Sequence, residues 1–143
     1  MIQVKLFLCA DSAAIDMRTN ALSAFQIIDQ LHAPSFPVAI PRISMIASLT
    51  REATDPSDVT LQLQIHSGNQ QLYAGPVQIN FLQQLSARTI VDMHGLLVPA
   101  PGSLQFLLSR DAEALSSWTI LVNHIGRPEA QMSFPLAQAP PVT

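Results

Sequence analysis

A strict alternation of apolar and polar residues between positions 59 and 66 is the feature that most narrows the folds open to this chain. The apolar positions are Val59, Leu61, Leu63 and Ile65, and the polar ones are Thr60, Gln62, Gln64 and His66. Because successive side chains of a β-strand point to opposite faces, this segment is predicted to be a strand with one buried face. The same alternation appears in residues 2–8 and, after the Pro101–Gly102 turn signal, in residues 104–108.

Further extended segments complete an all-β pattern. They are predicted at residues 21–29, 38–49, 72–82, 87–98, 114–125 and 129–136, which brings the total to about nine strands. Turn-forming residues separate the segments, and no long segment shows the apolar periodicity of an amphipathic helix. Short helical turns are expected only at Ser12–Met17 and Leu82–Leu85, where Ala, Met, Gln and Leu favour helix. The fold class predicted is therefore an antiparallel β-sandwich of eight or nine strands.

The chain length predicts a single domain. A chain of 143 residues matches the usual size of one hydrophobic core. We expect the sandwich to occupy residues 1–136 and residues 137–143, with adjacent Pro140 and Pro141, to form a flexible tail. The longest apolar runs span only about six residues, too few to cross a membrane as a helix. The apolar run near the N-terminus is interrupted by Asp11 and is too short for a signal peptide.

Charge and cysteine content exclude several classes of protein. The net charge is −3, and the seven Lys and Arg residues are scattered along the chain, whereas a nucleic-acid binder needs clustered bases. The single cysteine, Cys9, cannot form a disulfide within the chain. A chain without an internal disulfide is typical of a reducing compartment, so we expect a cytoplasmic protein. Because Cys9 lies in an apolar strand, it is interpreted as a buried, inert thiol.

Three short motifs suggest a family. They are Phe7-Leu8-Cys9-Ala10-Asp11, Asn20-Ala21-Leu22-Ser23-Ala24-Phe25 and Pro34-Ser35-Phe36-Pro37. Together with the Pro101–Gly102 turn, they resemble a family of short bacterial β-sandwich proteins of unknown function. Its members show a Cys-Asp-like opening strand, an Asn-x-x-Gly-x-Phe stretch and an x-Phe-Pro turn. Here Ser23 replaces the glycine, and Ala10 separates Cys9 from Asp11. The resemblance implies a fold and no activity.

Catalytic signatures are lacking in the sequence. It has no Walker A loop, nucleophile elbow, His-Glu-x-x-His or Cys-x-x-Cys motif. Asp92 and His94 share one strand face with Arg88, an arrangement interpreted as a surface ion pair, with an acid–base or metal pair as the alternative. Trp118 is interpreted as a core anchor, with stacking on a sugar or base as the alternative. No catalytic residue or cofactor is therefore predicted.

Sorting the loops by sandwich end yields two further hypotheses. If each strand crosses the sandwich once, the acidic loops around Asp16, Asp55 and Asp111 share one end with Asp11, Asp58 and Glu113. Carboxylates of this kind bind Ca²⁺, but Arg18, Arg51, Arg88 and Arg110 at the same end favour ion pairing. The opposite end collects the four candidate metal ligands His32, His66, His94 and His124. A metal-binding protein or metal-dependent enzyme using this end is the alternative function.

Apolar residues on both faces of several strands suggest an interaction surface. Apolar residues make up 48% of the chain and charged residues only 12%. A strand of a two-layer sandwich needs only one buried face, so a second copy, a partner or a flap of the same chain is expected to cover the other. We therefore predict a binding or assembly module without catalysis that self-associates as a homo-oligomer. Phe36 and Pro37 are expected to offer an apolar lip to a partner.

Overall fold

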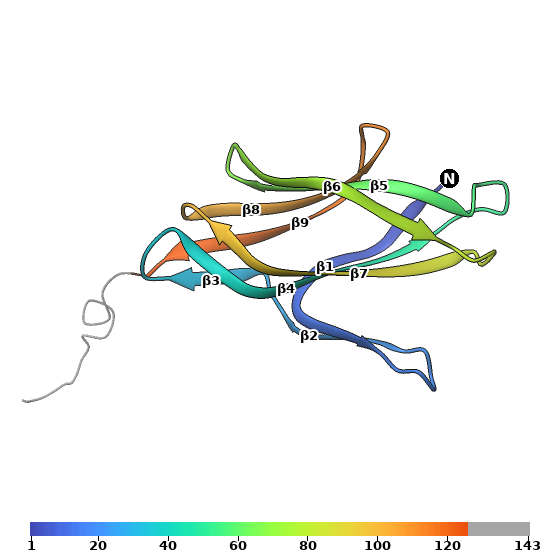
Figure 1. Ribbon diagram of the computed structural model, residues 1–143, viewed down its shortest axis with the longest axis horizontal. Coiled ribbons are helices and arrows are strands. Elements are labelled where there is room, and N and C mark those ends of the chain that lie inside the picture. The colour runs from blue at the N-terminus through green and yellow to red at the C-terminus, as the bar shows by residue number, and fades with distance from the viewer. Residues whose placement is uncertain (126–143) are drawn as a thin grey trace, which may run out of the picture.

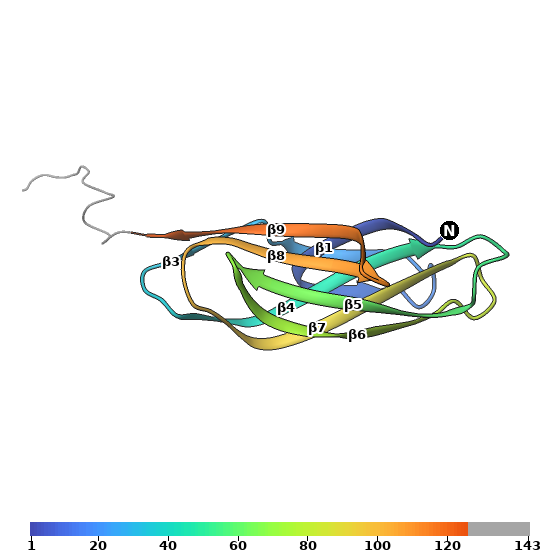
Figure 2. The same ribbon diagram turned by 90° about the horizontal axis from the view of Figure 1, so that it is seen from above.

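The computed structural model describes residues 1–125 of the chain, and every regular element in that range is a β-strand. The strands are β1 (Gln3–Ile15), β2 (Leu22–Ile27), β3 (Gln30–Ala33), β4 (Val38–Thr50), β5 (Asp58–Ser67), β6 (Gln70–Asn80), β7 (Ser86–Val98), β8 (Gly102–Arg110) and β9 (Glu113–His124). They form two sheets with the orders β2-β1-β4-β7 and β3-β9-β8-β5-β6. The predicted all-β sandwich is confirmed (Figures 1 and 2).

All neighbouring strands are antiparallel except one pair. β3 runs parallel to β9, with His32 opposite Asn123. This arrangement arises because β2 and β3 follow each other with only residues 28 and 29 between them and belong to different sheets. The chain thus crosses from one sheet to the other at Ile28–Asp29. The sequence predicts a single strand at 21–29 and does not reveal this crossing.

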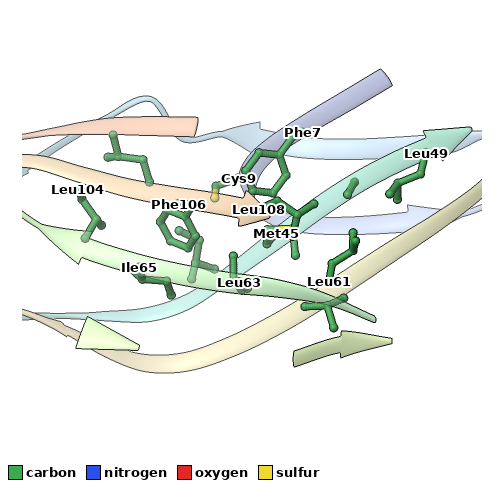
Figure 3. Close-up of a cluster of buried hydrophobic side chains, with 14 of the residues drawn as sticks. Phe7, Cys9, Met45, Leu49, Leu61, Leu63, Ile65, Leu104, Phe106 and Leu108 are labelled. Carbon is green, nitrogen blue, oxygen red and sulfur yellow. The ribbon is translucent and has the colours of Figure 1, made fainter. Parts of the chain in front are cut away.

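The predicted alternation produces the core between the two sheets. From β5, Leu61, Leu63 and Ile65 are at most 1% exposed, and β8 contributes three fully buried residues, Leu104, Phe106 and Leu108. Facing them from the other sheet are Phe7, Cys9, Met45 and Leu49 (Figure 3). These side chains form one continuous apolar cluster, whose removal from water is the main favourable contribution to folding.

A bend in β1 gives the molecule a third layer. The first half of β1 pairs with β4 as far as Ala10, and from Ala10 onward β1 pairs with β2 instead. The β1–β2 hairpin (residues 10–27) therefore leaves the four-stranded sheet and folds back under its outer face. In Figure 1 the hairpin lies below β4 and β7, on the side opposite the five-stranded sheet.

The hairpin covers a second apolar cluster. Leu8, Ala10 and Ile46 are at most 8% exposed, although they point away from the sandwich core. The hairpin residues Leu22 and Ala24 pack against them. The sequence left three possible covers for these additional apolar residues: a second copy, a partner or a flap of the same chain. For Leu8, Ala10 and Ile46 the cover is a flap of the same chain. Leu121, on the outer face of β9, remains 50% exposed.

Polar contacts fix the hairpin at both ends. At the bend, Nη2 of Arg42 is 2.8 Å from Oδ2 of Asp11. At the tip, Nη2 of Arg88 donates to the carbonyl of Asn20 at 2.7 Å. Asn20 has a φ of 61°, a conformation that Asn adopts more readily than most residues. Just beyond β2, the indole N–H of Trp118 donates to the carbonyl of Ile28 at 2.8 Å.

Three local predictions are wrong or incomplete. Ser12–Ile15, expected in a helical turn, continues β1, because β2 supplies a strand partner that overrides local helix propensity. Residues 82–85 form a turn in which Leu82 and Gln83 have positive φ, so no helical turn exists there. Strand β3 was not anticipated as a separate element. The predicted strand at 129–136 and the tail at 137–143 lie outside the described residues.

Within residues 1–125 there is no helix with the length and apolar character needed to span a membrane.

The second cluster predicts an unusual mutational effect at Ile46. Substitution Ile46→Ala should destabilise the protein by about 2–4 kcal/mol, because it opens a cavity under the hairpin at a site that would face solvent in a bare sandwich. Chemical denaturation followed by Trp118 fluorescence measures the change. Leu121→Ala, on an outer face without a covering layer, is the matched control and should cost less than about 1 kcal/mol. Equal small effects in both variants would show that the hairpin does not bury Ile46.

Burial of Cys9 predicts that its thiol does not react in the folded protein. Cys9 is fully buried, and desolvation raises the pKa of its thiol to about 12. Since the thiolate is the nucleophile, alkylation by iodoacetamide at pH 8 should proceed only as fast as the protein opens. Mass spectrometry should find the native protein unlabelled and the urea-unfolded protein fully labelled. Rapid labelling without denaturant would contradict this placement of Cys9.

Candidate functional site

A groove lies between strands β6 and β7 on the described part of the chain. Each is one of the two edge strands of its sheet, and residues 81–85 connect them. The groove has a volume of about 530 Å³. It lies between the first residues of β6 and the last residues of β7, where the lining is Ile65, Gln70, Gln71, Leu72, Tyr73, Met93, His94, Gly95, Leu96, Leu97 and Pro99.

The floor of the groove is apolar and belongs to the core. Ile65 is fully buried, and the partly buried Leu72, Met93 and Leu96 pack against the core cluster. At the rim, the side chains of Tyr73 and Leu97 are 45% and 56% exposed. The groove is therefore a place where the core reaches the surface along the open side of the sandwich.

Glycines shape both walls. Tyr73 lies opposite Ile65 in the ladder, and its ring covers the position that a Cβ at Gly75 would occupy. On the other wall, Gly95 has a φ of +71°, a region that residues with a side chain rarely adopt. Gly75 thus leaves room for the Tyr73 ring on one wall, and Gly95 allows a backbone conformation on the other wall that other residues rarely adopt.

The groove contains no formal charge. None of its lining residues is Asp, Glu, Lys or Arg, and His94 is the one titratable side chain besides Tyr73. Covering such a surface removes no ion from water, so the desolvation cost is small. Chemically the groove can bind apolar or aromatic groups and can hydrogen-bond them through Gln70 and Gln71.

The two edge strands differ in their capacity to accept another strand. Pro76 lies within β6 and has no backbone N–H, so it interrupts the donors of that strand. β7 contains no proline across its 13 residues. In the part of the chain that the structure describes, no strand pairs with β7 on the side away from β4. β7 is thus a long edge with unpaired backbone groups.

Asp92 and His94 lie on the outer face of the four-stranded sheet, as their spacing predicts. The hydroxyl of Ser44 donates to Asp92, and Arg42 lies opposite His94 in the ladder. Arg88 does not pair with Asp92; it reaches Asn20 instead. Asp11, and to a lesser degree Asp92, raise the pKa of the Arg42 guanidinium. The surface ion pair at this face is therefore formed by Arg42 and Asp11.

The four candidate histidines lie on four strands that end at the same end of the sandwich (Figures 1 and 2). Each has a different neighbourhood. His66 is hydrogen-bonded to Gln64, His94 lines the groove, and the ring of His124 lies 6.1 Å from that of Phe36. His32 is exposed on β3. Among residues 1–125, no three His, Cys, Asp or Glu side chains lie close enough to hold a metal ion.

The acidic residues are likewise separated. Asp11 pairs with Arg42 at the bend of β1, away from the other acidic loops. Oδ1 of Asp16 accepts the backbone N–H groups of Thr19 and Arg18, which lower the pKa of that carboxyl. Oδ2 of Asp55 accepts the backbone N–H of Glu52 at 2.8 Å. These carboxylates serve turns and ion pairs at the surface.

Phe36 and Pro37 precede β4 at the histidine end. Phe36 is partly buried and packs against the core cluster, while Pro37 is exposed. Phe36 thus contributes most of its ring to the interior, which leaves Pro37 as the exposed residue of the predicted apolar lip.

The groove beside β7 was not predicted from the sequence. Its only signals were the glycines inside two strands, Gly75 and Gly95, since glycine in a strand often marks a bulge or a close approach.

Comparison with known families finds one match that covers most of the chain. The model of a family described as "Family of unknown function (DUF6941)" matches residues 5–123. The expectation of a family of unknown function is confirmed at this level. No curated protein is significantly similar in sequence to the chain.

Solved structures with a similar fold are distant in sequence. An immunoglobulin-like protein from Pseudomonas aeruginosa is 8% identical, with a TM-score of 0.45 over 85% of this chain and 96% of that protein. A β-glucosidase from Listeria innocua is 6% identical, with a TM-score of 0.48 over 89% of this chain and 17% of the enzyme. A Pseudomonas fluorescens alkylpurine DNA glycosylase is 11% identical, with a TM-score of 0.44 over 85% of this chain and 30% of the enzyme. The chain spans less than a third of either enzyme.

The contact between Tyr73 and Gly75 can be tested by substitution. Gly75→Ala should push the Tyr73 ring off the groove wall, because a Cβ would overlap the phenol. The displaced ring is at the surface, so the stability cost should stay below about 1 kcal/mol, less than overpacking a closed core. NMR should show changed shifts for the Tyr73 ring and the groove residue Leu96. Unchanged Tyr73 shifts, or a loss of several kcal/mol, would show that the ring does not lie over Gly75.

Proposed function

We propose that this chain, which belongs to the family of unknown function DUF6941, is a binding module without catalysis that self-associates through β7 and the adjoining groove. One observation carries the proposal: an uncharged groove with an apolar floor lies directly beside a long edge strand without a partner. A monomer gains nothing from keeping such a surface exposed to water.

Charge and shape both favour a protein surface as the occupant. The cores of protein interfaces are depleted of charged residues and enriched in aromatic residues and Met. The groove matches this pattern, with Tyr73 and Met93 in its lining and no Asp, Glu, Lys or Arg. Leu97, 56% exposed at the rim, would become buried on contact.

A second copy of the chain is the occupant that fits the free edge best. Two β7 strands related by a two-fold axis can pair antiparallel, so each supplies the backbone donors and acceptors that the other lacks. Because β7 has no proline and β6 contains Pro76, the pairing would run along β7. The grooves then lie on either side of the joined strands and can take up rim side chains from the partner.

The absence of catalysis in this proposal is supported by the placement of the nucleophilic side chains. Cys9 is buried with a raised thiol pKa, and the hydroxyl of Ser44 is buried against Asp92. In the described residues, the one histidine hydrogen bond to another side chain joins His66 and Gln64. The scattered bases and the free buried thiol also favour a cytoplasmic module that binds protein and no nucleic acid.

The oligomeric state tests the proposal. The wild-type protein should elute as a dimer or higher oligomer in size-exclusion chromatography with light scattering. Leu97→Asp should shift it to monomer, because the substitution places a charge in the middle of the buried contact. Leu121→Asp is the matched control, since Leu121 is similarly exposed on the outer face of the other sheet. A wild-type protein that stays monomeric at high concentration, or an equal effect of both substitutions, would refute self-association through β7.

A further inference from the structure

A second, smaller pocket lies beneath the tip of the β1–β2 hairpin, on the outer face of the four-stranded sheet. Its volume is about 240 Å³, and it is lined by Ile15, Asn20, Ser48, Ser86, Ala87 and Arg88. The hairpin supplies Ile15 and Asn20, β4 supplies Ser48, and β7 supplies the rest. The pocket therefore exists only while the hairpin is folded over the sheet.

Arg88 is the one charged residue of this pocket, and one of its nitrogens has no partner. Nη2 donates to the carbonyl of Asn20 at 2.7 Å. Nη1 is buried and makes no hydrogen bond to any residue in the described range. In the same range, no carboxylate lies within 4.0 Å of the Arg88 guanidinium, since every ion pair involves other residues.

A buried guanidinium nitrogen without an acceptor is costly. Leaving a charged donor without a partner forfeits its hydration without an internal hydrogen bond in return. Two acids on the elements that line the pocket, one on the hairpin and one on β7, make other hydrogen bonds. Asp16 accepts backbone N–H groups of its own turn, and Asp92 accepts the Ser44 hydroxyl. Within residues 1–125 no group supplies an acceptor to this nitrogen.

The other polar groups of the pocket are suited to the same acceptor. Ser48 lies directly opposite Arg88 in the ladder, and Ser86 lies two residues before Arg88 on the same strand face. Their hydroxyls, like the side-chain amide of Asn20, can donate to an oxygen. One fixed positive charge with several neutral donors is the composition of sites that bind oxyanions.

We propose that this pocket binds a small oxyanion, a carboxylate or a phosphate, which accepts from the guanidinium of Arg88 and from the hydroxyls of Ser48 and Ser86. The anion would neutralise the buried charge and tie the hairpin tip to β7. Ligand binding to the folded state then also stabilises the closed hairpin. The site is separate from the groove, which lies along the opposite half of β7, so the two proposals stand or fall independently.

NMR titration with two probes tests the site and distinguishes the two anion classes. Sodium phosphate and sodium acetate are added separately at constant ionic strength maintained with sodium chloride. The Nε–H of Arg88 and the amides of Ser48 and Ser86 should shift and saturate, with a dissociation constant of about 1 mM or tighter for the better probe. Tighter binding of phosphate assigns a phosphate site, and tighter binding of acetate assigns a carboxylate site. Linear shifts without saturation for both probes would overturn the proposal.

Charge-matched variants distinguish a specific anion-binding site from nonspecific electrostatic attraction of the anion. Arg88→Gln should weaken binding by about tenfold or more, the effect of losing a charge-assisted hydrogen bond. Arg18→Gln removes the same charge from the exposed hairpin turn and should leave binding unchanged. Ser86→Ala should keep the hairpin folded, as judged by unchanged Leu22 amide shifts, and should weaken binding about threefold. Equal weakening by Arg88→Gln and Arg18→Gln, or no weakening by both Arg88→Gln and Ser86→Ala, would contradict the site.

Discussion

The bend of β1 at Ala10 is the constraint on which the rest of the structure depends. Up to this residue β1 belongs to the four-stranded sheet, and beyond it β1 pairs with β2 alone. The chain thereby places a two-stranded layer over the outer face of its own sheet. The apolar residues on that face, Leu8, Ala10 and Ile46, are buried by Leu22 and Ala24 in place of a second molecule. The bend is held by the Arg42–Asp11 ion pair.

This covering separates the molecule into sides with different properties. The outer face beneath the hairpin is closed, and the small pocket with Arg88 lies at its margin. Toward the opposite end of β7, the strand is an uncovered edge beside the groove. Trp118, on β9, packs against both apolar clusters. The surface proposed for self-association therefore centres on the half of β7 that the hairpin tip does not reach, and it is narrower than the apolar excess of the sequence suggested.

The sequence predicted the elements whose pattern is local. Alternation in residues 59–66 identified β5, and the spacing of turns identified the all-β class. Placing the four histidines at one end was also correct, because β2 and β3 together make one crossing. The bend of β1 was not predictable, since residues 12–17 are locally compatible with a helical turn and only the pairing of Ser12 and Ala13 with β2 makes them a strand. The groove depends on how β6 and β7 diverge, which no residue pattern encodes beyond two glycines.

Distances between methyl groups of the hairpin and of the sheet test the central claim most directly. Leu22 and Ala24 pack against the cluster that contains Ile46, and Ile90 of β7 packs against the same cluster. In a protein with isotope-labelled methyl groups, nuclear Overhauser effects should connect Leu22 and Ala24 with Ile46 and Ile90. Their absence, with hairpin methyl groups showing contacts only to each other and to solvent, would contradict a hairpin folded over the outer face.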